Sequence, residues 1–429
     1  MSKKILLSIV AIAAIATIVL AACAPAPPPA PTVDDSMIKE LEAQAAEAES
    51  RAAEAIAQAE AAEGDIEAAQ AAAEEAKKEA EAAKDALAEA IATEEPEPTP
   101  SSYDCSGFKL GGVVHWQGPY TLQILDGAKA AAEECGGEVQ TAGPAAFDTP
   151  AQYAAFQDLV DSGVEAIITV GYPSEFWIKP IDEAVNKGVL VSTVDVASPS
   201  SLQYIYAGPK VSDLGRALAN TIIDEIGEDA EGEVVTGLCL PGLDVIAERY
   251  IGFKNTFAER APNVTVSDPF DVTFDTAENF AKWQEIISTQ PDALAFVGFC
   301  EHDLNNLAKI KEDDGGEYIV ASVGINPETL KAVEDGIGLV VVGQKPFMQG
   351  YVTMRAMLEG LVYNQEVPRG WADVGAEIVT IENAADVRAR EESLTEGYDQ
   401  TKEFYTPEIS IIFEDFASYV QSFGDYLSQ

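Results

Sequence analysis

Residues 110–135 read LGGVVHWQGPYTLQILDGAKAAAEEC, an apolar run followed at once by a stretch with helical spacing of its apolar residues. Further apolar runs of the same kind occur at 166–170, 189–194, 234–240, 293–299 and 318–323. Helical stretches lie between the runs, for example at 122–135, 152–162 and 248–260. Strands buried on both faces that alternate with amphipathic helices are typical of a mostly parallel sheet covered by helices. About a dozen such elements are more than a single open sheet and its helices usually contain, so the pattern predicts two doubly wound α/β lobes.

Polar and aromatic side chains follow the ends of these predicted strands. In open parallel sheets, ligands bind beyond the carboxyl ends of the strands, where two such lobes face each other. Hydrogen-bonding side chains orient a sugar or small polar ligand, and aromatic rings stack on its apolar face. We therefore expect an interlobe ligand site made from residues at these positions: Trp116, Gln117, Tyr120, Asp195, Arg249, Glu301, His302 and Gln344.

Each of these residues also has a structural alternative. Asp195 can cap a turn, Arg249 can pair with acids on a helix surface, and Tyr120 can pack in a core. A lone histidine such as His302 is more often structural than functional. Glu301 belongs to no loop of alternating oxygen ligands, so the sequence gives little support for a cation site.

The composition of the chain excludes several functional classes. Its 429 residues include 26 Lys plus Arg and 73 Asp plus Glu, a formal net charge of −47. Nucleic acids and anionic lipid headgroups are bound by basic surfaces, so neither is expected as a partner. With 2 histidines and no HExxH, CxxC or GxSxG motif, the sequence predicts no catalytic site, no metal and no cofactor.

Residues 1–22 have the layout of an export signal. Lys3 and Lys4 precede an apolar run at 5–19, which is shorter than the roughly 20 residues that a membrane span needs. The sequence LAAC at 20–23 resembles the lipobox of bacterial lipoproteins, in which the cysteine is lipidated and becomes the mature N-terminus. We expect a lipoprotein signal peptide over 1–22 and lipidation at Cys23. A plain signal peptide or a membrane helix is the alternative.

A spacer and a stalk follow this signal. Residues 23–35 are rich in proline, which favours an extended linker. Residues 36–93 are rich in Ala and Glu, and a heptad register that begins at Ile38 places only apolar residues at both core positions. We expect a helical stalk there, either a lone acidic helix or a weak coiled coil, with a disordered tail as the remaining alternative. Residues 94–104 form a second linker.

From about residue 108 to 382 the sequence resembles the type I periplasmic binding proteins, in particular the ribose-binding group of ABC transporters. The likeness rests on motifs in a specific order: Pro119-Tyr120, Asp126-Gly127-Ala128, Asp195, Glu248-Arg249, Gly252-Phe253, residues 331–336 and Gln344. It implies two lobes that close on ligand, joined by three crossings near Gly208, Gln344 and Gly375. The first lobe is expected to comprise 105–208 and 345–374. The second comprises 209–344 and 375–429, including a C-terminal extension.

The resemblance also implies roles for single residues. Tyr120 matches an aromatic ring that stacks on the sugar, and Asp195 matches a carboxylate that accepts bonds from adjacent hydroxyls. Arg249 matches an arginine that donates to ligand oxygens. Gln344 matches a hinge glutamine that contacts the ligand.

Three positions depart from the ribose-binding pattern. Val196 stands where that group has a second arginine, Cys300 where it has an asparagine, and Gly324 where it has an aspartate. The loss of these polar groups weakens the case for a pentose. It favours a ligand that is larger, less hydroxylated, or held by other residues: Trp116, Gln117, Trp177, Glu301, His302 or Trp371.

These observations predict a lipid-anchored, extracytoplasmic solute receptor that hands a carbohydrate-like ligand to an ABC permease. A sensory receptor on the same scaffold, signalling to a membrane protein, is the second hypothesis. A glycosidase that uses Asp195 and Glu301 is the third, and it is disfavoured because no motif places a nucleophile against a base. A DNA-binding repressor is excluded, because an export signal stands where a helix-turn-helix would be.

Apart from the cysteine of the lipobox, the chain has four cysteines, an even number in a sequence expected to be exported. Cys105 precedes the first strand and Cys135 ends the helix that returns to it. Cys239 and Cys300 end two strands of the second lobe. We expect the bridges Cys105–Cys135 and Cys239–Cys300, because each stays within one lobe. Buried free thiols are the alternative.

Overall fold

The computed structural model describes residues 103–241, 244–394 and 396–427. Within these ranges no helix is both long enough and apolar enough to cross a membrane. The signal peptide at 1–22, the lipidated Cys23, the linker at 23–35 and the stalk at 36–93 lie outside the described residues, as does most of the linker at 94–104. These parts of the sequence analysis stay predictions.

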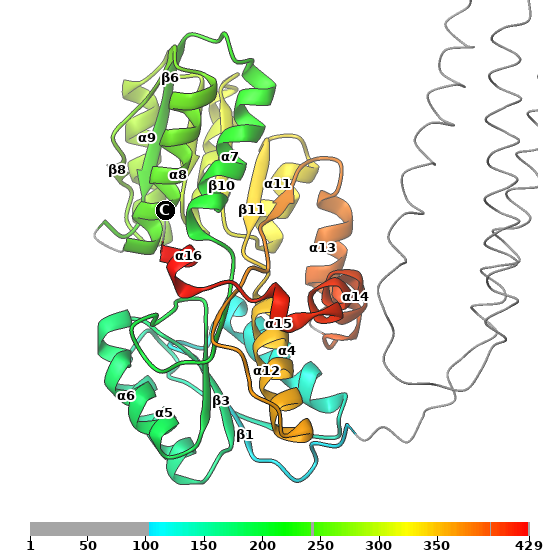
Figure 1. Ribbon diagram of the computed structural model, residues 1–429. Coiled ribbons are helices and arrows are strands. Elements are labelled where there is room, and N and C mark those ends of the chain that lie inside the picture. Colours follow the sequence, from blue (N-terminus) through cyan, green and yellow to red (C-terminus); the bar gives the residue numbers. More distant parts are fainter. Residues whose placement is uncertain (1–102, 242–243, 395, 428–429) are drawn as a thin grey trace, which may run out of the picture. The chain divides into compact units, whose positions relative to one another are not determined.

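The first lobe is built on a six-stranded parallel sheet with the strand order β12-β5-β4-β3-β1-β2. Figure 1 labels β1 and β3 of this sheet. The strands are β1 (Leu110–Val113), β2 (Val139–Ala142), β3 (Ala166–Val170), β4 (Leu190–Val194), β5 (Ile205–Ala207) and β12 (Gly370–Ala372). In this register Leu110 pairs with Val139 on one side and with Ala166 on the other. One face packs against α4 (Pro119–Glu133) and α12 (Pro346–Tyr363). The other face packs against α5 (Thr149–Asp161) and α6 (Ser174–Asn186).

The second lobe has a seven-stranded sheet with the order β13-β11-β10-β9-β6-β7, and β8 also pairs with β6. Its strands are β6 (Gly232–Leu238), β7 (Val264–Val266), β8 (Phe270–Asp271), β9 (Ala295–Gly298), β10 (Ile319–Val323), β11 (Val340–Gly343) and β13 (Glu377–Val379). Only β13 runs antiparallel to its neighbour within this sheet. The helices are α7 (Val211–Ile226), α8 (Asp244–Arg260), α9 (Thr276–Thr289), α10 (Asp303–Asp314), α11 (Pro327–Glu334) and α13 (Ala384–Ser393).

The chain passes between the two sheets three times. β5 of the first lobe is followed by α7 of the second, β11 of the second by α12 of the first, and β12 by β13. The connecting residues are 208–210, 344–345 and 373–376. The two doubly wound lobes and the three-segment hinge predicted from the sequence are confirmed.

Burial and capping explain why these residues form these elements. β3 (AIITV) is buried at every position because helices cover both faces of the sheet. The edge strand β2 (VQTA) exposes Gln140 and Thr141. Helices begin at side chains that accept backbone hydrogen bonds: Asp148 caps α5 through the N–H of Ala151, and Asp275 caps α9.

The C-terminal extension contacts both lobes. α13 packs on the second lobe, where Val387 joins the core. α14 (Asp399–Glu414) packs beside α12, and its residues Tyr405, Ile409 and Ile412 join the core of the first lobe. The short helices α15 (Phe416–Tyr419) and α16 (Phe423–Leu427) follow. The expectation that 375–429 belongs to the second lobe is therefore wrong from α14 onward, because the apolar face of α14 is buried in the first lobe.

Both expected cysteine pairs are bonded in the structure. Cys105–Cys135 joins the segment before β1 to the end of α4, with a Cα–Cα distance of 5.1 Å. Cys239–Cys300 joins the residues that follow β6 and β9, with a Cα–Cα distance of 6.1 Å. All four side chains are buried. The second bridge therefore lies at the carboxyl edge of its sheet, on the side where a ligand site is expected.

Candidate ligand-binding site

Asp195 directly follows β4 and has a left-handed backbone conformation, with a φ of 63°. Aspartate tolerates this conformation better than most residues with side chains. The N–H of Asp195 donates to Oε1 of Gln349 (2.7 Å), and its carbonyl accepts from the Tyr206 hydroxyl (3.1 Å). The Tyr120 hydroxyl donates to its Oδ1 (3.0 Å). Among the described residues, Oδ2 has no hydrogen-bond partner, so one carboxylate oxygen is left for a ligand.

Gln349, in the first turn of α12, links these groups. Its buried Nε2 donates to the Tyr120 hydroxyl (3.1 Å) and to the carbonyl of Gln344 (2.9 Å), so Gln344 contributes through its backbone. Burial, followed by the charge of Asp195, raises the pKa of Tyr120 well above its usual value, which keeps the hydroxyl protonated. The carboxylate is thus oriented by the protein itself. We call the following residues the carboxylate cluster: Asp195, Tyr120, Tyr206 and Gln349.

Arg249 faces this cluster from α8 of the second lobe. Its Nη1 donates to the carbonyl of Phe299 after β9 (2.9 Å), and its buried Nε has no partner in the described part of the chain. Burial lowers the pKa of the guanidinium, whereas Tyr120 and Asp195 in the opposite lobe raise it. α8 is held closely against α7, because a Cβ on Gly215 would lie 1.8 Å from the Arg249 carbonyl oxygen. One lobe therefore offers an acceptor and the other a donor at the same place.

His115 lies beside the cluster at the end of β1. It is 8% exposed, and its ring packs edge-on against Phe147 with 4.9 Å between centroids. Burial lowers its pKa, and the charge of Asp195 opposes that shift. Its Nδ1 is buried and finds no hydrogen-bond partner within the described residues. A third unused polar atom is therefore close to Asp195.

Trp116 and Gln117, both predicted ligand contacts, have other local roles. The Trp116 indole is half-buried and covers Gly118, where a Cβ would lie 2.0 Å from the ring. Gln117 is exposed, and its Nε2 donates to the carbonyl of Gly143 after β2 (2.6 Å). Gln117 is thus tied to a neighbouring loop and not to the carboxylate cluster.

Glu301 and His302 lie at the carboxyl edge of the second-lobe sheet but have different neighbours. Burial raises the pKa of Glu301, with further contributions from Glu328 and Glu391. The His302 ring packs edge-on against Phe274 (5.2 Å), and burial lowers its pKa. None of these neighbours belongs to the carboxylate cluster, so the structure does not bring Glu301 and His302 into it.

The tryptophans Trp177 and Trp371, considered as alternative ligand contacts, are structural. Trp177 is fully buried, and its indole donates to the Tyr172 carbonyl (2.9 Å). Trp371 is 3% exposed, and its indole donates to the Gly208 carbonyl at the first crossing (2.8 Å). Both rings are buried, and both indole N–H groups bond to the backbone, so neither ring presents a face or a free donor in this structure.

Comparison with known proteins identifies the family. A family model described as a periplasmic binding protein domain matches residues 113–363, more than half of the chain. The chain belongs to the periplasmic binding protein family. Among curated proteins there is no significant match.

Solved structures with the same fold resemble this periplasmic binding protein. The sugar-binding protein of a sugar ABC transporter from Bacillus halodurans has a TM-score of 0.60 and 21% identity, covering 64% of this chain and 98% of its own. An ABC transporter solute-binding protein from Burkholderia graminis C4D1M, in complex with D-arabinose, has a TM-score of 0.59 and 23% identity, covering 65% and 97%. The XylFII–LytSN complex has a TM-score of 0.55 and 20% identity, covering 64% and 98%. At these identities the likeness establishes the type I fold.

Two further kinds of site, a metal site and a catalytic carboxylate pair, were considered for this periplasmic binding protein. Among the described residues, no three His, Cys, Asp or Glu side chains form a group that could hold a metal ion. Asp195 and Glu301, the pair considered for a glycosidase, have separate surroundings: Tyr120 bonds the first, and Glu328 acts on the second. The two carboxylates therefore do not share an environment in the structure.

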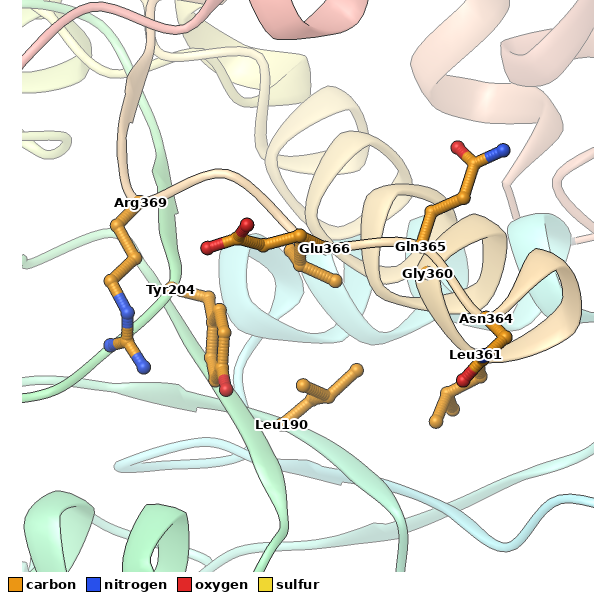
Figure 2. Close-up of a pocket in the computed structure, with 9 residues that line it drawn as sticks. Leu190, Tyr204, Gly360, Leu361, Asn364, Gln365, Glu366 and Arg369 are labelled. Atoms are coloured by element: carbon orange, nitrogen blue, oxygen red, sulfur yellow. The ribbon is translucent and has the colours of Figure 1, made fainter.

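Two cavities of this periplasmic binding protein lie away from the carboxylate cluster. The cavity in Figure 2 has a volume of about 310 Å³ and lies near Leu190, at the opposite end of β4 from Asp195. Its Arg369 guanidinium stacks on the Tyr204 ring at 3.9 Å. The other cavity, of about 450 Å³, is lined by residues from α5 and α6: Pro150, Tyr153, Phe176, Lys179, Pro180 and Glu183. Neither cavity contains a residue that we predicted to bind ligand.

Sequence reasoning missed two members of the carboxylate cluster. Gln349 is an isolated amide among buried apolar residues of α12 (PFMQGYVTM), and that isolation was a usable signal. Tyr206 lies in a three-residue buried strand, IYA, and the sequence pattern there indicates only an apolar core residue. Its role depends on a hydroxyl contact that no sequence pattern records.

Proposed function

We propose that this protein is an extracytoplasmic solute receptor that binds a sugar or similar polyhydroxylated ligand between its lobes and delivers it to an ABC importer. The observation that carries the proposal is that Asp195 of the first lobe lies near enough to Arg249 of the second to raise the pKa of the guanidinium, while Oδ2 of Asp195 and Nε of Arg249 have no hydrogen-bond partner among the described residues. A carboxylate accepts hydrogen bonds from adjacent hydroxyls, and a guanidinium donates to hydroxyl or ring oxygens. Each lobe thus supplies one half of the recognition, as closure around a ligand requires.

The polar atoms without hydrogen-bond partners at the boundary between the lobes suit a ligand rich in hydroxyl groups. Oδ2 of Asp195 can accept, Nε of Arg249 can donate, and Nδ1 of neutral His115 can do either, depending on its tautomer. A hydroxyl group donates and accepts at once, so a sugar can satisfy all of these groups together. A purely apolar ligand would leave them buried and unpaired, at a cost of about 1–3 kcal/mol each.

Three departures from the ribose-binding pattern limit which sugar the site is proposed to bind. Cys300 is 4% exposed and bonded to Cys239, so it cannot replace the ligand-binding asparagine. Gly324 has no side chain, and Val196 has no polar group. With three fewer polar groups than a ribose receptor, the site is proposed to bind a different sugar, or the same sugar more weakly.

A thermal-shift screen of pentoses, hexoses, inositols, disaccharides and nucleosides tests the binding function. D-arabinose belongs in the panel because a protein of similar structure was solved with it. A bound sugar should raise the melting temperature, because it stabilises the folded state by RT ln(1 + [L]/Kd). A flat response across the panel, or turnover of any sugar added, contradicts the proposal.

We also propose that the protein is anchored to the membrane through a lipid on Cys23 and held away from it by residues 36–93. The LAAC sequence at 20–23 supports the anchor, and the Ala- and Glu-rich composition supports the spacer. Cys23→Ala should shift the protein from the membrane fraction to the soluble fraction. Unchanged membrane association of this variant contradicts the lipid anchor.

A sensory role is the second candidate function. One of the similar structures is described as a complex of two named components, XylFII and LytSN. A receptor that signals and a receptor that delivers share the same ligand site, and they differ in the protein that recognises the closed form. Sugar-dependent co-purification with a permease supports delivery, whereas co-purification with a signalling membrane protein supports sensing.

A further inference from the structure

The last helix of the structure, α16, reaches the seam between the lobes, where Figure 1 shows it in red. Its Tyr426 is only 8% exposed. The Tyr426 ring packs against Tyr206 of β5 (5.0 Å between centroids) and against Trp371 of β12 (5.6 Å). The family match ends at residue 363, so α16 lies outside it.

Tyr206 connects α16 to the carboxylate cluster. It is fully buried, and its hydroxyl donates to the carbonyl of Asp195 (3.1 Å). The ring of Tyr206 is held by a small apolar group made with Ala197, Trp371 and Tyr426. Removing the Tyr426 ring takes away one of the packing contacts of Tyr206, so the Tyr206 ring can move. Asp195 then loses a support for a backbone conformation that most residues avoid.

The second lobe also lies near Tyr426. Burial raises the pKa of Tyr426 to about 12, and the charge of Glu248 adds to the shift. Glu248 directly precedes Arg249 in α8. Tyr426 therefore lies between a residue that supports Asp195 and a residue adjacent to Arg249.

The hinge fixes the position of the C-terminal extension. Trp371 and Gln421 exchange two backbone hydrogen bonds of 2.8 Å each, next to the third crossing. Glu408 of α14 pairs with Lys345 at the second crossing (2.7 Å), where the lysine is largely buried. These contacts place α16 at the seam in a defined orientation.

We propose that Tyr426 is a positioning residue of the ligand site. It holds Tyr206 against the carbonyl of Asp195 and thereby keeps the free carboxylate oxygen directed at the ligand. The inference rests on the proposed function and adds to it a residue from outside the family domain.

The test compares sugar affinity in full-length variants by calorimetry, using the sugar that gives the largest thermal shift, beginning with D-arabinose. Tyr426→Ala should weaken binding at least tenfold, which is about 1.4 kcal/mol. Tyr426→Phe keeps the ring but loses the hydroxyl, which hydrogen-bonds to Tyr206, so its loss of affinity should be smaller than that of Tyr426→Ala. Leu427→Ala on the same helix is the matched control, because Leu427 is 62% exposed, and its affinity should not change. Circular dichroism checks folding, and Tyr426→Leu replaces the alanine variant if that variant does not fold.

A double-mutant cycle with Tyr206→Phe separates positioning from general destabilisation. If Tyr426 acts through Tyr206, the double variant should bind no more weakly than the weaker single variant. Additive losses, or a Tyr426→Ala variant that binds the sugar as tightly as the wild type, overturn the inference and leave the proposed function standing. A wild-type protein that binds no sugar overturns the proposed function, and the inference falls with it.

Discussion

Asp195 and Asp303 each follow a strand at the carboxyl edge of a parallel sheet, one in each lobe, but their surroundings differ. Asp303 is fully buried, and both of its carboxylate oxygens are used. They accept hydrogen bonds from Asn279 Nδ2 (2.8 Å), Trp283 Nε1 (2.9 Å) and the Cys300 N–H (2.9 Å). Asp195 is partly exposed, and its side chain accepts one bond, from Tyr120.

The difference separates a structural carboxylate from a candidate ligand contact. A carboxylate whose oxygens are already used by the protein has little left to offer a ligand. Asp303 stabilises the loop after β9, whose Phe299 carbonyl also holds Arg249. Asp195 is held mainly through its backbone, which leaves its side chain available. Asp303 is therefore a structural residue of the second lobe, whereas the side chain of Asp195 in the first lobe keeps an oxygen available.

Removing the bridge Cys239–Cys300 should have the largest effect on stability. Replacing both cysteines with alanine frees a loop with a sequence separation of 61, and the chain-entropy model predicts a loss of about 4 kcal/mol of unfolding free energy. Sugar affinity should fall as well, because Cys300 follows the residue that holds Arg249. Urea denaturation and calorimetry measure the two effects.

The bridge Cys105–Cys135 is the matched control. It spans 30 residues and should contribute about 3.5 kcal/mol, but it lies before β1, away from the carboxyl edge. Its removal should leave sugar affinity unchanged. Equal losses of affinity in both double variants would show that the second bridge has no special link to the site. Free thiols at all four cysteines in peptide mapping would show that neither bridge forms.

Asp195→Asn should weaken sugar binding by about 1.5–3 kcal/mol, the net contribution of a hydrogen bond to a charged group. Asparagine tolerates the left-handed conformation, so the unfolding free energy should change little. Calorimetry gives the affinity, and urea denaturation gives the stability. A variant that binds sugar normally would place the ligand elsewhere.

Asp303→Asn should show the reverse behaviour. The amide nitrogen of asparagine cannot accept a hydrogen bond, so at least one of the three donors loses its partner. We expect a loss of about 1–3 kcal/mol of unfolding free energy, with sugar affinity retained. Lost affinity at unchanged stability would move Asp303 from the supporting role to the binding role.

The smallest expected effect is the pH dependence of the unfolding free energy that comes from the titration of Asp303. Burial raises its pKa to about 6 in the folded protein, above the unfolded value. The protonated form therefore favours the folded state, and this stabilisation is lost as the pH rises through about 6. The wild-type unfolding free energy, relative to Asp303→Asn, should rise by about 1 kcal/mol from pH 7 to pH 5. A constant difference between the two proteins over this range would contradict the raised pKa.

The sequence predicted the buried strands better than the exposed ones. Runs such as 166–170 and 318–323 correspond closely to β3 and β10, because strands covered on both faces are apolar throughout. β8 is exposed at both residues and β2 at its centre, so neither shows an apolar run. Their pairing depends on neighbouring strands, which a local pattern does not record.

The candidate site was predictable in part for a similar reason. Asp195, Tyr120 and Arg249 stand at strand ends or at the starts of helices, and the structure brings them to one place. Gln117 lies at a strand end as well, but it bonds a neighbouring loop. Position along a strand indicates the edge of the sheet, whereas the direction of each side chain depends on tertiary contacts. Tyr206 was missed for that reason.

The order of segments along the chain has a consequence for biosynthesis. Six strands of the second-lobe sheet, β6 to β11, form one continuous segment, 232–343, and can pair once it leaves the ribosome; only the edge strand β13 comes later. In the first lobe β5 pairs with β12, where Tyr206 lies opposite Trp371. Strands β6 to β11 of the second lobe lie between these two strands in the sequence. The edge of β5 stays unpaired until residues 370–372 are made, and unpaired strand edges promote aggregation. Chains that stop short of β12 should therefore depend on chaperones through their first lobe, even after strands β6 to β11 of the second lobe have paired.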